Sequence, residues 1–131
     1  MKKIFIGCCL LFSSASAFCD WSYVAESTGG DSYYIDAATA KKLGNSNVRV
    51  WILENYIEPL RYANIVAYSS KTLRQVDCLN QRHKILSNNF YSQAMGKGAA
   101  VHISNEETNW SYSAPDSVFA AVVNAACNRA R

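Results

Sequence analysis

The residues Val48-Arg49-Val50-Trp51-Ile52-Leu53 are the clearest indication of the fold class. Its β-branched and aromatic residues favour a β-strand. Apolar residues on nearly both faces are typical of a strand that is covered on both sides. We therefore predict that residues 48–53 form a central strand of a sheet.

The chain before this stretch predicts a hairpin. Residues 21–25 and 32–35 are short and rich in aromatic side chains, and the Ser, Thr, Gly and Asp of 27–31 favour a turn between them. Residues 36–44 predict one or two helical turns, with Asp36 as the N-cap and Gly44 as the stop signal. The first two strands are therefore expected to pair with each other.

The chain after this stretch predicts further strands. Residues 57–70, interrupted by Pro59, indicate a loop or an edge strand. A second hairpin is expected from 71–77 and 84–91, and residues 95–98 are expected to turn the chain again. The last strand spans 100–104 and 109–112, with an interruption at Glu106 and Glu107.

The hydrophobic period changes after Pro115. Apolar residues recur at spacings of three and four in one stripe, and Pro115 with Asp116 supplies a helix start signal; the stripe comprises Phe119, Val122, Val123, Ala126 and Cys127. A helix that is apolar on one face packs against a sheet. We therefore predict an α+β domain, an antiparallel sheet with one C-terminal helix packed on it.

The first 17 residues have the features of a signal peptide. Lys2 and Lys3 precede the apolar run 4–12 and the small residues 13–17, and the run is shorter than the roughly 20 residues needed to span a membrane. Cleavage would leave a single domain, residues 18–131, and would lower the formal net charge from +3 to +1. So small a charge does not favour nucleic acid or an anionic membrane as a partner.

Export places the remaining cysteines in an oxidising compartment. Cys8 and Cys9 lie in the predicted signal peptide, which leaves Cys19, Cys78 and Cys127 as an odd set. The residues favour a Cys78–Cys127 disulfide, because Cys19 lies near the predicted new N-terminus, where chains fray. The other pairings stay open, and Cys19 is expected to be a free thiol or a link between two chains.

No constellation of residues predicts catalysis. We find no nucleophile with a base, no metal-ligand spacing and no phosphate-binding loop, so we predict a protein that is not an enzyme and has no metal and no cofactor. His83 and His102 are expected to be solvent-facing strand residues. The same surface position is expected for the acidic residues Glu54, Glu58, Glu106 and Glu107.

Positive charge is concentrated in residues 71–97, which hold five basic residues and one acidic residue. This segment predicts a binding face for an acidic protein partner. The alternative is an ordinary solvated sheet edge, since lysines also protect exposed strands from aggregation. The five residues are Lys71, Arg74, Arg82, Lys84 and Lys97.

Several local motifs together resemble the surface-adhesin E family of small exported Gram-negative proteins. They are Cys19-Asp20-Trp21, residues 31–36, Val48-Arg49-Val50-Trp51, Asp77-Cys78, residues 95–98, Trp110, and residues 114–117 leading to Cys127. The resemblance implies a sheet of about six strands, with a C-terminal helix tied to it by a disulfide corresponding to Cys78–Cys127. It also implies adhesion to host matrix and serum proteins such as vitronectin and laminin, and a capacity to form homodimers.

The expected localisation is periplasmic or secreted rather than surface-bound. A lipid-anchored family member needs a small residue before its modified cysteine, and here Phe18 precedes Cys19. The alternative function is therefore a periplasmic structural or accessory module that binds an envelope component.

Overall fold

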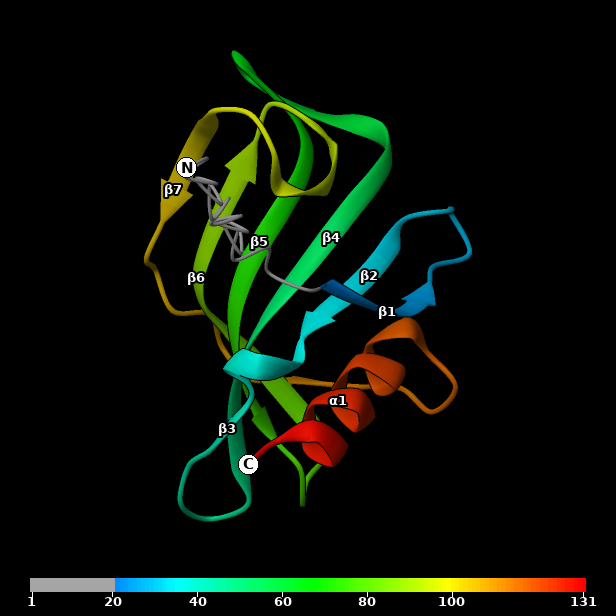
Figure 1. Cartoon of the computed structure of the whole chain (residues 1–131), viewed down its shortest axis with the longest axis vertical. Coiled ribbons are helices and arrows are strands. Elements are labelled where there is room, and N and C mark those ends of the chain that lie inside the picture. The colour runs from blue at the N-terminus through cyan, green and yellow to red at the C-terminus, as the bar shows by residue number, and fades with distance from the viewer. Residues whose placement is uncertain (1–20) are drawn as a thin grey trace, which may run out of the picture.

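A computed structural model describes residues 21–131. The predicted signal peptide and Cys19 lie outside the described residues. The described chain forms an antiparallel sheet and one α-helix (Figure 1). The elements are β1 (Trp21–Glu26), β2 (Ser32–Asp36), β3 (Lys41–Lys42), β4 (Asn47–Tyr62), β5 (Ile65–Asp77), β6 (Arg82–Tyr91), β7 (Ala100–Ser104), β8 (Ser111–Tyr112) and α1 (Val118–Arg129), with 3₁₀ turns at Ala37–Thr39 and Ala94–Gly96.

The strand order is β1-β2-β4-β5-β6-β7, with β3 paired to β4 and β8 paired to β6. Strand β4 has neighbours on both sides, which confirms the predicted central position of residues 48–53. The sheet has eight strands rather than the expected six or so. The two additional strands have two residues each, too few to show any alternation in the sequence.

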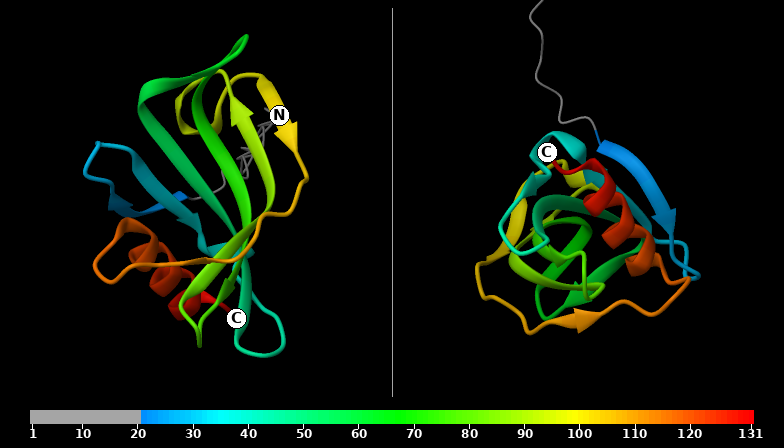
Figure 2. Two further views of the ribbon diagram at one scale, coloured as in Figure 1. Left: turned by 180° about the vertical axis from the view of Figure 1, so that it is seen from behind. Right: turned by 90° about the horizontal axis from the view of Figure 1, so that it is seen from below.

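The prediction of a loop or edge strand at residues 57–70 is wrong. Strands β4 and β5 continue through this segment as one long hairpin in the middle of the sheet. Pro59 is tolerated because the β4–β5 pairing is irregular between Asn55 and Leu60, so no regular ladder bond is lost there. As a result the hairpin extends well beyond the end of the sheet that α1 covers (Figures 1 and 2).

The helical turns predicted at 36–44 are only partly present. One 3₁₀ turn covers Ala37–Thr39, and the chain then enters β3. Asp36 occupies the N-cap position as predicted, but it is buried and its side chain makes no capping bond. Instead, Thr39 Oγ1 donates to the Asp36 carbonyl at 2.8 Å and accepts from the Trp51 amide at 3.1 Å, which ties the turn to β4.

The hydrophobic core lies between α1 and one face of the sheet. Side chains alternate along β4, so Val48, Val50 and Ile52 point to the same face and are at most 3% exposed. From α1, Val122, Val123 and Ala126 are similarly buried. The core also contains Tyr33, Ile35, Ala40 and Val76.

The helix begins slightly later than predicted. Ser117, rather than Pro115 or Asp116, is the N-cap, and its Oγ accepts from the Ala120 amide at 3.1 Å. The predicted apolar stripe is the face that packs on the sheet, with Phe119 and Cys127 at its partly buried border. Among the described residues, no helix is long and apolar enough to cross a membrane.

The last strand is divided, in agreement with the predicted interruption. Strand β7 pairs with β6 at residues 88–91, whereas β8 pairs with β6 at Arg82 and His83. Glu106 and Glu107 lie in the connection between the two pieces and are exposed. This connection brings Trp110 back to the beginning of β6.

Candidate functional site

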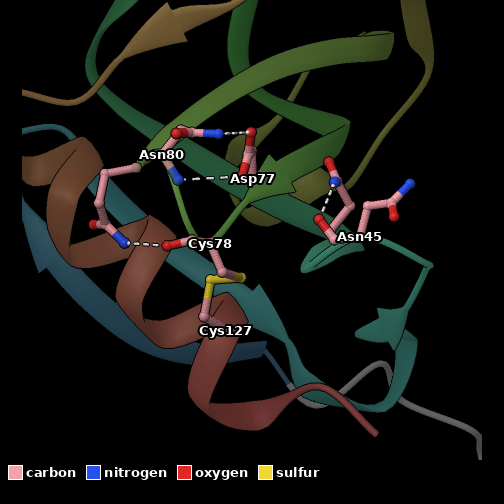
Figure 3. Close-up of a disulfide and its surroundings, with 7 residues drawn as sticks. Asn45, Asp77, Cys78, Asn80 and Cys127 are labelled. Carbon is pink, nitrogen blue, oxygen red and sulfur yellow. Dashed lines mark hydrogen bonds between the residues drawn. A yellow bond between two sulfur atoms is a disulfide. The ribbon is translucent and has the colours of Figure 1, made fainter.

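A disulfide joins Cys78, just after β5, to Cys127 in the last turn of α1 (Figure 3). The two Cα atoms are 5.9 Å apart. The bond confirms the pairing that the residues favoured and fastens the C-terminal part of the helix to the sheet. The disulfide therefore holds residues 78–81, which connect β5 to β6, close to the end of the helix.

Asp77 organises the turn beside the disulfide. Its carboxylate accepts from the Asn80 side-chain amide at 2.9 Å, from the Asn80 backbone amide at 3.2 Å and from Arg82 Nε at 2.9 Å. These hydrogen bonds, with Asn80 the largest contributor, lower the pKa of Asp77 to about 2. The turn that presents Arg82 is thus fixed by an ionised carboxylate.

Arg82 and Lys84 meet over one aromatic ring. The guanidinium carbon of Arg82 lies 4.4 Å from the Trp110 ring centroid, and Lys84 Nζ lies 4.8 Å from it. Lys84 also forms an ion pair with Glu107. Two large apolar side chains on the adjoining segments are strongly exposed, Leu79 at 77% in the turn before β6 and Tyr112 at 73%, which pairs with Arg82. We call Leu79, Arg82, Lys84, Trp110 and Tyr112 the Trp110 surface.

The other predicted cations are dispersed. Lys71 Nζ lies 4.9 Å from the Tyr91 ring centroid and 5.8 Å from that of Trp21. Lys97 is exposed in the turn that follows the 3₁₀ segment Ala94–Gly96. The five residues therefore do not form one continuous array, although Lys71 and Lys84 lie on the same face of the sheet.

Arg74 is not part of the basic surface. Arg74 lies three residues from Lys71 in the same strand, and side chains in a strand alternate between the two faces. Arg74 therefore points to the face that α1 covers and is only 4% exposed. Its guanidinium donates from Nε to Thr72 Oγ1 at 2.9 Å and from Nη1 to His83 Nδ1 at 3.0 Å. It also lies over the Phe119 ring of α1, 5.2 Å from the centroid.

His83 is buried rather than solvent-facing, so that prediction is wrong. The imidazole is stacked on Phe119 with a centroid distance of 5.2 Å, and the residue is 8% exposed. Since an arginine can only donate, the Nδ1 of His83 is the acceptor from Arg74 and the ring is neutral. Burial, followed by the charge of Arg74, lowers the pKa of His83 to about 4.

Protein stability is therefore expected to fall as the pH decreases from about 6.5 to about 4. In this pH range His83 is protonated in the unfolded chain but stays neutral in the folded protein, so protonation favours the unfolded state. The free energy of unfolding should fall by an amount on the order of 2 kcal/mol. Urea denaturation of wild type and His83→Gln at pH 7 and pH 4 measures the difference. The wild type should lose more stability than the variant.

The comparison of variants is needed because another nearby group titrates with the opposite sign. Burial raises the pKa of Glu54, so ionisation of Glu54 lowers stability as the pH rises. Glu54 is present in both proteins and its effect cancels in the difference. His102→Gln, which removes an exposed histidine, is the matched control. Equal pH dependence of wild type and His83→Gln would contradict the assignment.

A polar pocket of about 860 Å³ lies on the Arg74 face of the sheet. Its lining includes Glu54, Tyr56, Ser70, Thr72 and Arg74. The Tyr56 hydroxyl donates to Ser70 Oγ at 2.9 Å, and burial raises the pKa of Tyr56 to about 12. Tyr33 OH donates to Glu54 Oε1 at 2.7 Å. Glu54 is therefore half-buried and hydrogen-bonded, which corrects the predicted surface position.

This pocket is not among the features predicted above, although the alternation of residues along β4 contains a signal for it. In β4 the residues at 48, 50 and 52 are apolar and those at 54 and 56 are polar, on the same face. Such a change from apolar to polar side chains marks the point along β4 at which this face of the sheet is no longer part of the hydrophobic core. No group of three metal-ligating side chains within residues 21–131 is arranged to hold a metal ion.

Comparison with known structures supports the fold. Two crystal forms of Haemophilus influenzae protein E match with TM-scores of 0.62 and 0.64, each at 18% sequence identity over 82% of this chain and over 83% and 87% of theirs. Protein E from non-typeable H. influenzae matches with a TM-score of 0.54 at 19% identity, over 82% of this chain and 73% of that chain. No match was found among curated protein sequences.

The family model for surface-adhesin protein E matches residues 21–128, which is nearly all of the described chain. The antiparallel sheet, the C-terminal helix and the Cys78–Cys127 bond are the features that the sequence resemblance implies. The chain therefore belongs to the surface-adhesin protein E family.

Proposed function

We propose that this protein is an exported, non-enzymatic binding protein that engages an acidic region of a protein partner through the Trp110 surface. The observation that carries the proposal is the placement of Arg82 and Lys84 on one indole ring, beside the exposed Leu79 and Tyr112. Arginine, tryptophan and tyrosine are the residues most enriched at energetic centres of interfaces.

Family membership and charge suggest the partners to test first. Host matrix and serum proteins, vitronectin and laminin in particular, are the candidates that the family resemblance implies. Lys71 and Lys97 add positive charge elsewhere on the protein and would assist encounter with an acidic partner, whereas Arg74 is too buried to do so. Export rests on the signal-peptide features of residues 1–17.

Neutralising the two cations should weaken binding. We expect Arg82→Gln/Lys84→Gln to reduce the affinity for vitronectin or laminin about tenfold and to flatten its salt dependence, because two of the attractive charges are lost. Glutamine is preferable to glutamate here, since a new carboxylate would face Asp77 or Glu107. Biolayer interferometry at several salt concentrations measures both effects.

The control for this experiment is Lys41→Gln/Lys42→Gln. It removes the same charge from two exposed lysines of β3 and leaves the Trp110 surface intact. We expect it to have only a small effect on affinity. Equal losses in the two double variants, with both proteins folded by circular dichroism, would contradict the proposed surface.

The alternative function is that of a periplasmic module that binds an envelope component. Phe18 favours it, because a lipid-anchored protein needs a small residue before its modified cysteine and Phe18 precedes Cys19. Cell fractionation separates the two functions. Protein on the cell surface or in the medium supports adhesion, and protein confined to the periplasm supports the alternative.

A further inference from the structure

The pocket on the Arg74 face contains a buried cation, Arg74, and a half-buried anion, Glu54, that do not contact each other. The half-buried Asp31 and the exposed Glu58 and Arg61 also contribute to its lining. Arg74 and Glu54 both line it, and neither takes part in the two ion pairs formed within residues 21–131. Their charged atoms are therefore more than 4 Å apart. Each charge still affects the other, since Glu54 raises the pKa of Arg74 and Arg74 lowers that of Glu54 against the larger effects of burial.

Neutral partners hold the two charged groups in these separate positions. Arg74 is fixed by Thr72 and His83, and Glu54 is fixed by Tyr33. A buried ion pair that serves stability alone closes into direct contact, because only close contact compensates the cost of burial. A buried cation and a half-buried anion that are kept apart are instead suited to a guest that carries both opposite charges.

Asn88 is a third polar residue in the pocket, and its side-chain oxygen has no hydrogen-bond partner within the described chain. The Oδ1 atom of Asn88 is buried and has no hydrogen-bond partner among the described residues. Asn88 lines the pocket and is paired with Thr72 across the β5–β6 ladder, diagonally from Arg74. A buried acceptor is almost always satisfied in a folded protein, so an N–H group from a ligand fits this position.

We propose that this pocket binds an amino-acid zwitterion, with its carboxylate on Arg74, its ammonium group on Glu54 and Asn88 Oδ1, and its side chain against Phe90 and Ile85. Phe90 and Ile85 contribute the apolar part of the lining on β6. The pocket volume of about 860 Å³ accommodates a free amino acid or a short peptide, which present the same two charged ends. This site is separate from the Trp110 surface, and it goes beyond the proposed function.

The test uses ligands that differ only in charge. NMR titration of the purified protein with L-phenylalanine should give saturable shifts of the Ser70, Thr72 and Asn88 amide signals. Phenylalaninamide, which lacks the carboxylate, and N-acetylphenylalanine, which lacks the ammonium group, should each bind about tenfold more weakly. Glycyl-phenylalanine shows whether the site takes peptides as well as free amino acids.

Variants assign each end of the ligand. Arg74→Gln should remove the preference for phenylalanine over its amide, and Glu54→Gln should remove the preference over the N-acetyl derivative. Glu54→Gln keeps an acceptor for Tyr33, so its fold should persist even if Arg74→Gln unfolds. Arg49→Gln, on an exposed position of β4, is the control for Arg74→Gln, because it removes the same positive charge.

Three results would overturn the proposal. The first is the absence of saturable shifts with both phenylalanine and glycyl-phenylalanine. The second is equal binding of the zwitterion and its two singly charged derivatives to wild type. The third is an equal loss of affinity in Arg49→Gln and in the folded pocket variants.

Discussion

Removal of the disulfide is expected to lower the free energy of unfolding by about 4 kcal/mol in the double variant Cys78→Ala/Cys127→Ala. The bond joins residues 49 positions apart, so it restricts a long loop of the unfolded chain that contains β6, β7 and β8. Single domains are commonly stable by only 5–15 kcal/mol, roughly, so this loss is a large fraction of the total. No other single bond in the described fold joins such distant elements covalently.

Guanidinium denaturation under non-reducing conditions measures this effect. Cys19→Ser is the control, because it removes a cysteine and leaves the Cys78–Cys127 bond in place. The single variant Cys127→Ser should expose a reactive thiol at Cys78, detectable with Ellman's reagent in the unfolded protein. An unchanged denaturation midpoint in the double variant would show that the bond contributes nothing to stability.

Truncation of Ile52 should cause the second large effect. Ile52 is 1% exposed and lies in the core formed by the sheet and α1. We expect Ile52→Ala to destabilise the protein by about 3 kcal/mol, the sum of lost apolar burial and the cavity left behind. Because β4 is the central strand, its neighbours on both sides limit the relaxation that would fill the cavity.

The same strand supplies a matched control. Ile57 has the same side chain but is 67% exposed, where β4 has left the core. Ile57→Ala should change the free energy of unfolding by less than about 0.5 kcal/mol. Urea denaturation measures the free energy of unfolding of the two variants. Similar losses in both would mean that the core extends along β4 as far as Ile57.

Local patterns were sufficient for the elements that obey one period. The apolar run 48–53 predicted the central strand, and the stripe from Phe119 to Cys127 predicted the helix and the face that it buries. The long β4–β5 hairpin was missed because Pro59 carries a strong breaking signal, which the irregular pairing beside it neutralises. Whether a proline ends a strand therefore depends on how that strand pairs with its neighbour, which the sequence does not show.

The positions of Arg74 and Lys71 were in principle readable from the sequence. Residues three apart in one strand point to opposite faces, so the two cations could not share a surface. The charge count of residues 71–97 grouped them because it ignored this alternation. The burial of Arg74 follows from the alternation once the face covered by α1 is known.

The class of the fold is predictable from the sequence, since periodicity and the placement of cysteines are local or nearly local properties of the chain. The pocket depended on the tertiary structure. A register shift between β5 and β6 lets His83 and Ile85 share a face with Asn88 and Phe90, although their numbers differ in parity. Alternation along one strand cannot show such a shift, because the shift arises from pairing with the neighbouring strand.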